Sequence, residues 1–136
     1  MTKEQVFPAT LEALPQVQAF FEESLEAVDC PMKLMIGISV VIEEIFVNIA
    51  HYAYPDSEGT AAVSFSYEND SRTATFAFRD SGIPFNPLAH EDPDVTLSAE
   101  ERDIGGLGIF ITKKTMDTVN YVYENGENCL TMTKVL

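Results

Sequence analysis

Residues 32–53 read MKLMIGISVVIEEIFVNIAHYA, and this stretch decides the fold. It is apolar nearly all round, which predicts a buried helix. Because residues four apart share one helix face, Glu44 and Asn48 lie one above the other, and we expect both to point into the interior. An unpaired carboxylate is unfavourable there, so a hydrated or phosphate-bound divalent cation would satisfy the pair. Alternatively, the pair belongs to a polar stripe at the surface, which His51 extends as a structural histidine.

The size and charge of the chain limit its possible partners. The chain has 136 residues, the size of one ordinary domain, and 46% of them are hydrophobic. The formal net charge of -14 argues against direct binding to nucleic acid or to an anionic membrane, because phosphate neutralisation needs an excess of Lys and Arg. A nucleotide is not excluded, since a metal ion and backbone amides can neutralise a polyphosphate locally.

The sequence also predicts a cytoplasmic location. No signal peptide is expected at the start of the chain. The apolar stretch contains charged side chains such as Lys33 and Glu43, which disfavours a membrane span. Cys30 and Cys129 are far apart and form no Cys-x-x-Cys motif, which suits a reducing compartment better than a disulfide or a zinc site.

The hydrophobic periodicity predicts an alternation of helices and hairpins. Its order predicts one α+β domain over residues 1–136, a two-layer sandwich whose mostly antiparallel sheet packs on helices. The expected elements are a strand at 6–10, helices at 12–28 and 32–54, a hairpin of 60–67 and 73–80, a helix ending near 116, and a hairpin of 119–124 and 128–135.

Asp80 ends the second strand of the first predicted hairpin. Strand side chains alternate between faces, so Asp80 shares its side with Phe76 and Phe78 and is expected to be buried with them. A buried carboxylate needs hydrogen-bond donors. Gly82 follows two residues later and permits a close backbone approach. The alternative is an ordinary turn in which Asp80 contacts the next two residues.

A long acidic loop and a glycine cluster follow. Residues 83–103 show no sustained period and hold six acids between Glu91 and Asp103, and loops of this length are usually functional or disordered. The cluster Gly105-Gly106-Leu107-Gly108 then opens a helix, where free amides can bind phosphate. It is neither a P-loop nor a Rossmann motif, and a plain loop-to-helix turn is an alternative.

Taken together and in this order, these motifs resemble the GHKL (Bergerat-fold) ATP-binding domains of gyrase B subunits, Hsp90 chaperones and histidine kinases. Within that group the chain is similar to the anti-sigma factor serine/threonine kinases. The motifs are EEIFVNIAHYAY at 43–54, DSGIPFNP at 80–87 and GGLGIF at 105–110. The resemblance covers nearly the whole chain.

The resemblance implies a role for each residue of the helix and hairpin motifs. Asn48 would bind the Mg²⁺ that bridges the ATP phosphates, which fits a metal that takes only one or two protein ligands. Glu44 would be the general base on the attacking hydroxyl. Asp80 would accept a hydrogen bond from the adenine amino group, and Gly82 would let the purine approach.

The resemblance also assigns the phosphate side of the site. Gly105, Gly106, Leu107 and Gly108 would present amides to the phosphates. Residues 86–104 would form the ATP lid, and Arg102 would be its phosphate contact. Asn128 stands where the family commonly has a Thr that helps to hold the adenine-binding Asp, and it can still form hydrogen bonds.

The implied function is an ATP- and Mg²⁺-dependent kinase in transcription regulation. It would phosphorylate a serine or threonine of a STAS-domain anti-anti-sigma factor and sequester a sigma factor, with a homodimer suggested. One alternative is a module that binds nucleotide and a partner without kinase activity. Another is a detached histidine-kinase catalytic domain, whose partner would supply the accepting histidine because the chain has only His51 and His90.

Overall fold

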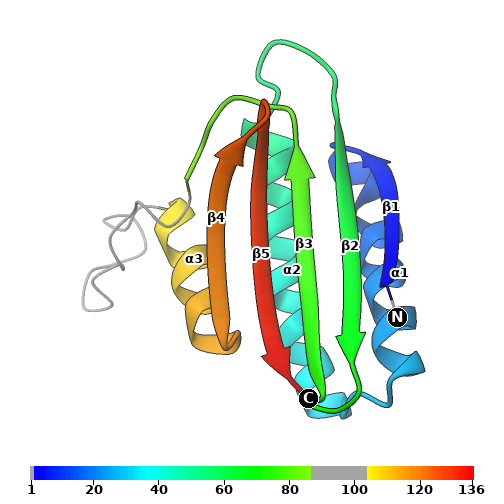
Figure 1. Cartoon of the computed structure of the whole chain (residues 1–136). Coiled ribbons are helices and arrows are strands. Elements are labelled where there is room, and N and C mark those ends of the chain that lie inside the picture. The colour runs from blue at the N-terminus through cyan, green and yellow to red at the C-terminus, as the bar shows by residue number, and fades with distance from the viewer. Residues whose placement is uncertain (1, 87–103) are drawn as a thin grey trace.

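The computed structural model describes residues 2–86 and 104–136, with 104–109 described by their backbone alone. The chain forms an antiparallel sheet with helices on one face, which confirms the predicted α+β sandwich (Figure 1). The sheet order is β1-β2-β3-β5-β4. The strands are β1 (Thr2–Pro8), β2 (Thr60–Glu68), β3 (Thr73–Asp80), β4 (Thr118–Glu124) and β5 (Glu127–Val135). The helices are the 3-10 turn η1 (Leu11–Ala13), α1 (Leu14–Ala27), α2 (Met32–Tyr52) and α3 (Ile104–Thr115).

Strands β2, β3 and β5 form the centre of the sheet, and one face of each strand packs into the hydrophobic core. Phe76 of β3 pairs with Phe65 on one side and with Met132 on the other, and all three side chains are fully buried. Alternate residues of β3 are buried along its whole length, up to Asp80. The strict alternation explains why the sequence placed β3 correctly at both ends.

The second hairpin turns where the sequence predicts it. Asn125 and Gly126 are the only residues between β4 and β5, and both have positive φ, at 55° and 77°. That geometry is required by a two-residue type I′ turn, which Asn-Gly supplies with little strain.

The first elements differ from their predicted bounds. The predicted strand at 6–10 is β1, which runs from Thr2 to Pro8 and pairs with β2 throughout. Only Phe7 of β1 is buried, so the strand is set by edge pairing and carries no hydrophobic alternation to predict it from. The predicted helix at 12–28 divides into η1 and α1 just before Pro15, which is favoured in a first helical turn.

Helix α2 is a core helix with one open side. Its buried residues are Met35, Ile38, Val41, Ile42, Ile45 and Phe46. The prediction that it is buried all round is wrong, because Met32, Ile36 and Val40 are 68%, 62% and 41% exposed. By length and composition α2 could cross a membrane, but its buried stripe packs into the core cluster shared with the sheet, as core helices of this kind do.

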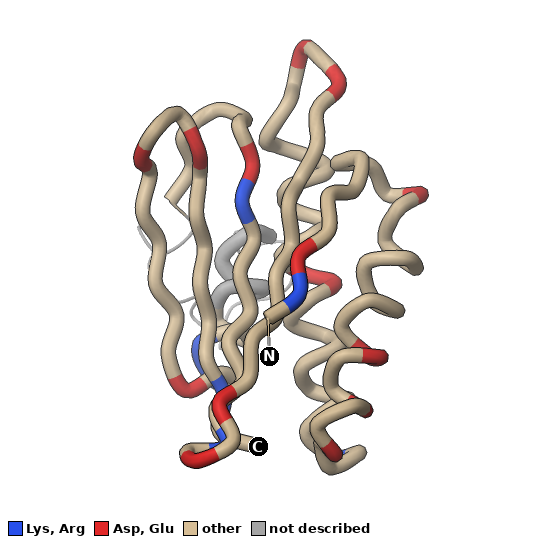
Figure 2. The backbone as a smooth tube through the Cα atoms, turned by 45° about the vertical axis from the view of Figure 1, so that its right-hand side comes forward, with Lys and Arg blue, Asp and Glu red and all other residues tan. Residues whose placement is uncertain are grey.

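Acidic residues dominate the described surface. Figure 2 shows Asp and Glu at loop tips and along the helices, with far fewer Lys and Arg. The sheet carries one cross-strand ion pair between exposed side chains, Arg79 to Glu4 at 2.7 Å. Exposed pairs of this kind contribute little to stability, so the core and not surface charge holds the fold together.

Candidate functional site

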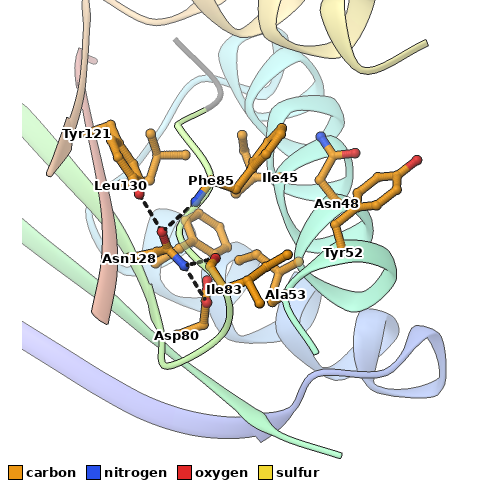
Figure 3. Close-up of a pocket in the computed structure, with 12 residues that line it drawn as sticks. Ile45, Asn48, Tyr52, Ala53, Asp80, Ile83, Phe85, Tyr121, Asn128 and Leu130 are labelled. Atoms are coloured by element: carbon orange, nitrogen blue, oxygen red, sulfur yellow. Dashed lines mark hydrogen bonds between the residues drawn. The ribbon is translucent and has the colours of Figure 1, made fainter. Parts of the chain in front are cut away.

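A pocket opens between the second half of α2 and the strands β3, β4 and β5 (Figure 3). It encloses about 500 Å³ of empty space, a volume that includes its open mouth. Its walls are largely apolar with a few convergent polar groups. The lining residues are Ile45, Asn48, Ile49, Tyr52, Ala53, Phe78, Asp80, Ile83, Phe85, Tyr121, Asn128 and Leu130.

Asp80 supplies a carboxylate to the pocket from the end of β3. The side chain is buried, with 6% of the residue exposed, and lies on the core face with Phe76 and Phe78, as predicted. Its Oδ1 accepts hydrogen bonds from Gly82 N at 2.9 Å and from Asn128 Nδ2 at 3.0 Å. No group in the described part of the chain donates to Oδ2. A buried carboxylate oxygen without a donor fits a ligand that brings an N–H group.

Asn128 uses all four hydrogen-bonding positions of its amide. Its Nδ2 donates to Asp80 Oδ1 and, at 2.9 Å, to the Ile83 carbonyl. Its Oδ1 accepts from Phe85 N at 3.1 Å and from the Tyr121 hydroxyl. Burial raises the pKa of the Tyr121 phenol, and the nearby Asp80 charge adds to the rise. The phenol therefore stays protonated and able to donate at neutral pH.

The segment after β3, residues 81–85, forms one rim of the pocket, and we call it the mouth loop. Ser81 N donates to the Tyr54 hydroxyl at 2.9 Å, and Ile83 N donates to the Ala53 carbonyl at 2.9 Å. Gly82 N donates to Asp80, and Phe85 N donates to Asn128. Residue 84 is a proline and has no N–H. Every backbone N–H of the mouth loop is therefore paired within the protein.

Tyr54 was missed by the sequence analysis. Its hydroxyl donates to the Thr60 carbonyl at 2.6 Å while accepting from Ser81 N, so it joins the end of α2 to β2 and β3. The sequence did contain a signal for Tyr54, because this residue ends the motif at 43–54 that also contains Asn48. Nothing in the local pattern shows that its hydroxyl reaches two distant backbone groups.

Gly82 permits a close backbone approach, as predicted, and the backbone that approaches belongs to Ala53. A Cβ on Gly82 would lie 2.6 Å from the Ala53 carbonyl carbon and closer still to its oxygen. Real Cβ atoms essentially never approach backbone this closely. The close approach that the glycine permits is therefore made by the end of α2. Whether a purine also approaches Gly82 stays a prediction.

Glu44 and Asn48 are less buried than predicted. Both are half-buried. The buried stripe of α2 faces the core, and Glu44 and Asn48 lie beside that stripe on the helix surface. The pair is therefore neither deep in the interior, as predicted, nor fully solvated, as in the alternative of a polar stripe at the surface. Asn48 lines the pocket across from Asp80, whereas Glu44 does not. His51 is exposed and lies outside the lining.

The glycine cluster begins α3 as predicted. Gly37 of α2 lies beside Thr115 of α3, with 3.5 Å between a Cβ built on the glycine and Cγ2, and the two helices run in opposite directions (Figure 1). Each helical residue adds about 1.5 Å, so α2 rises about 17 Å from Gly37 to Asn48, and α3 spans about 15 Å from Thr115 back to Gly105. The first turn of α3 and Asn48 therefore lie toward the same end of this helix pair (Figure 1).

Parts of the predicted phosphate side lie outside the described residues. These are Arg102, His90 and nearly all of the predicted lid at 86–104. For Gly105, Gly106, Leu107 and Gly108, the structure places only the helical backbone. The described residues contain no cluster of three or more His, Cys, Asp or Glu side chains that could hold a metal. Cys30 and Cys129 are both free thiols.

Two aromatic rings stand at the open side of the pocket. The rings of Tyr52 and Phe85 are stacked, with centroids 6.4 Å apart and planes 28° from parallel. They are 50% and 39% exposed, although both line the pocket. Exposed stacked aromatic side chains at a mostly apolar pocket suit a flat, partly apolar ligand.

A family model described as the histidine kinase-like ATPase domain matches residues 7–134. The chain belongs to this family. The GHKL resemblance and the anti-sigma factor kinase resemblance within it are confirmed by two relatives, each named serine-protein kinase RsbW, from Bacillus cereus and Bacillus thuringiensis. Each is 26% identical to this chain over 101 residues, which are 73% of this chain and 62% of the relative. The chain therefore matches less than two thirds of the length of these relatives.

A solved structure has the same fold. It is the crystal structure of the RsbU and RsbW domains of Rv1364c from Mycobacterium tuberculosis, with a TM-score of 0.69 and 16% identity. The match covers 98% of this chain and 32% of that chain. Membership of the family supports ATP use and relates the chain to anti-sigma factor kinases.

Proposed function

We propose that the chain is a partner-switching kinase that transfers the γ-phosphoryl group of ATP to a serine or threonine of a STAS-domain anti-anti-sigma factor. It also sequesters a sigma factor, acts in the cytoplasm and forms a homodimer. Family membership and the two RsbW relatives support this assignment. The pocket supplies the physical support.

The observation that carries the proposal is Oδ2 of buried Asp80, to which no described group donates, in a pocket with apolar walls. Oδ1 is already occupied by two donors, so only Oδ2 can receive a ligand N–H. The 6-amino group of adenine supplies that donor, and its flat ring suits walls made by Ile45, Ile83 and Phe85. These features support adenine as the base that the pocket binds.

Asn48 fits the predicted magnesium role in chemistry and in place. Its amide makes no hydrogen bond with other described residues, and it lines the pocket. Mg²⁺ prefers oxygen ligands and usually takes only one or two from protein, the rest coming from phosphates and water. When bound, the ion neutralises charge on the triphosphate. The Asn48 carbonyl oxygen is the group that would hold it.

Kinase activity is tested by incubating the protein with γ-labelled ATP, Mg²⁺ and a STAS-domain regulator, with the regulator's acceptor serine changed to alanine as the control. We expect label on the wild-type regulator alone. Label on neither regulator, together with ATP-dependent association of kinase and regulator, would instead support the second candidate. That candidate is a nucleotide-dependent binding module, and it is favoured by one observation: Glu44 does not line the pocket.

Asn48→Ala is expected to abolish Mg²⁺-dependent ATP binding while leaving the fold intact. Asn48 is half-buried and makes no hydrogen bond with the described residues, and alanine is the better helix former, so stability should stay within about 0.5 kcal/mol. Calorimetric titration with ATP in the presence and absence of Mg²⁺ measures the binding. An affinity equal to that of the wild type would remove Asn48 from the metal site.

Glu44→Gln is expected to keep ATP affinity and lower phosphoryl transfer by roughly 100-fold or more, as loss of a general base does. The change keeps the shape of a half-buried side chain and removes its basic oxygen. Exposed Glu43→Gln, one residue away, is the matched control and should retain wild-type turnover. If Glu44→Gln transfers phosphate at the wild-type rate, then Glu44 is not the base.

A further inference from the structure

The amide of Asn128 makes the two hydrogen bonds to the mouth loop that a neighbouring strand would make. One goes to the Ile83 carbonyl, an obligatory acceptor, and the other comes from Phe85 N, an obligatory donor. Because the two backbone partners differ in kind, they fix which way the amide faces. The Tyr121 hydroxyl bonds the same Oδ1 and adds to that orientation.

The same amide also donates to Asp80, so three parts of the pocket depend on one side chain. These are the Asp80 carboxylate inside the pocket, the backbone of the mouth loop, and the ring of Phe85, which stacks on Tyr52 at the open side of the pocket. Figure 3 shows Asn128 between Asp80 and the mouth loop, with Tyr121 on its other side. A threonine could donate to Asp80, but its single hydroxyl could not also bridge Ile83 and Phe85.

We propose that Asn128 is a positioning residue that holds residues 83–85 against β5 and so sets the mouth of the pocket before any ligand binds. The bridge replaces strand pairing at a point where β3 has ended and Pro84 cannot donate a hydrogen bond. Its effect on affinity rests on the proposed nucleotide binding, whereas its effect on the mouth loop does not.

The first arm of the test is amide hydrogen exchange in the protein without ligand. Asn128→Ala and Asn128→Thr should both raise the exchange rate of the Phe85 amide by up to about 10-fold. Alanine removes the acceptor, and a threonine hydroxyl is one bond shorter than Asn128 Oδ1, so once it donates to Asp80 we expect it not to reach Phe85 N. The Ile83 amide, which bonds the Ala53 carbonyl, should keep its wild-type rate. Thr131→Ala, on the opposite face of β5, is the control. An unchanged Phe85 rate, or an equal rise at Phe85, Ile83 and the β3 amides, would overturn the proposal.

The second arm measures ATP and inosine triphosphate affinities of the same variants. Asn128→Thr should keep the preference for ATP, because Asp80 keeps a donor, but should bind both nucleotides about 10-fold more weakly, because the mouth is no longer set. Wild-type affinities in Asn128→Thr alongside fast Phe85 exchange would overturn the link between the bridge and binding. If the wild-type protein binds neither nucleotide, the proposed function fails and the exchange arm alone decides the role of Asn128.

Discussion

Asp80→Asn is expected to lower ATP affinity by roughly 100-fold or more while leaving the fold as stable as the wild type. In the variant, the amide oxygen can still accept from Gly82 N and from Asn128 Nδ2. The NH₂ group then takes the position of Oδ2 and turns an acceptor into a donor. A donor facing the adenine amino group leaves two buried groups unpaired, which is the situation that hydrogen-bonding sites reject most strongly.

Inosine triphosphate supplies the matched control, since it carries a carbonyl oxygen where ATP carries the amino group. The side-chain amide that Asp80→Asn introduces can donate to that oxygen, so the variant should prefer inosine triphosphate over ATP, the reverse of the wild type. Calorimetric titration of both proteins with both nucleotides measures the four affinities. A variant that still prefers ATP would show that Asp80 does not read the base.

Gly82→Ala is expected to destabilise the protein by about 3 kcal/mol, at the upper end for overpacking. The added Cβ meets the Ala53 backbone, which cannot move without breaking the bond from Ile83 N to the Ala53 carbonyl. The mouth loop must shift, so nucleotide affinity should fall as well. Chemical denaturation followed by circular dichroism measures the free energy of unfolding.

Gly37→Ala is the control for the same chemical change. Its Cβ would make an ordinary 3.5 Å contact with Thr115 in the middle of α2, where alanine is favoured by up to about 1 kcal/mol. We therefore expect this variant to be at least as stable as the wild type. Equal effects at Gly82 and Gly37 would mean that the contact with Ala53 imposes no constraint.

The sequence was most informative where a local pattern and the tertiary structure agree. The alternation that ends in Phe76, Phe78 and Asp80 predicted both the strand and the burial of its carboxylate. Asn125-Gly126 predicted its turn, because few other residue pairs accept two positive φ angles. The motif order predicted the family, which the match over residues 7–134 confirms.

The sequence was less informative where long-range contacts decide the structure. It did not predict which side of α2 stays open, because Met32, Ile36 and Val40 are as apolar as the residues of the buried stripe. It also did not predict the bonds of Tyr54 to two other elements. For Asn128, the family resemblance predicted a hydrogen bond to Asp80, but the bridge to the mouth loop depends on where residues 83–85 lie.

The most direct test of the central claim is an NMR titration of the wild-type protein with Mg²⁺-ATP, followed through assigned amide and side-chain amide signals. We predict saturable shifts in the mouth loop, in the Asn48 and Asn128 side chains and at the end of β3, with smaller shifts for inosine triphosphate at equal concentration. Saturating shifts confined to other surfaces, or no shifts at millimolar ATP, would contradict the assignment of this pocket as the nucleotide site.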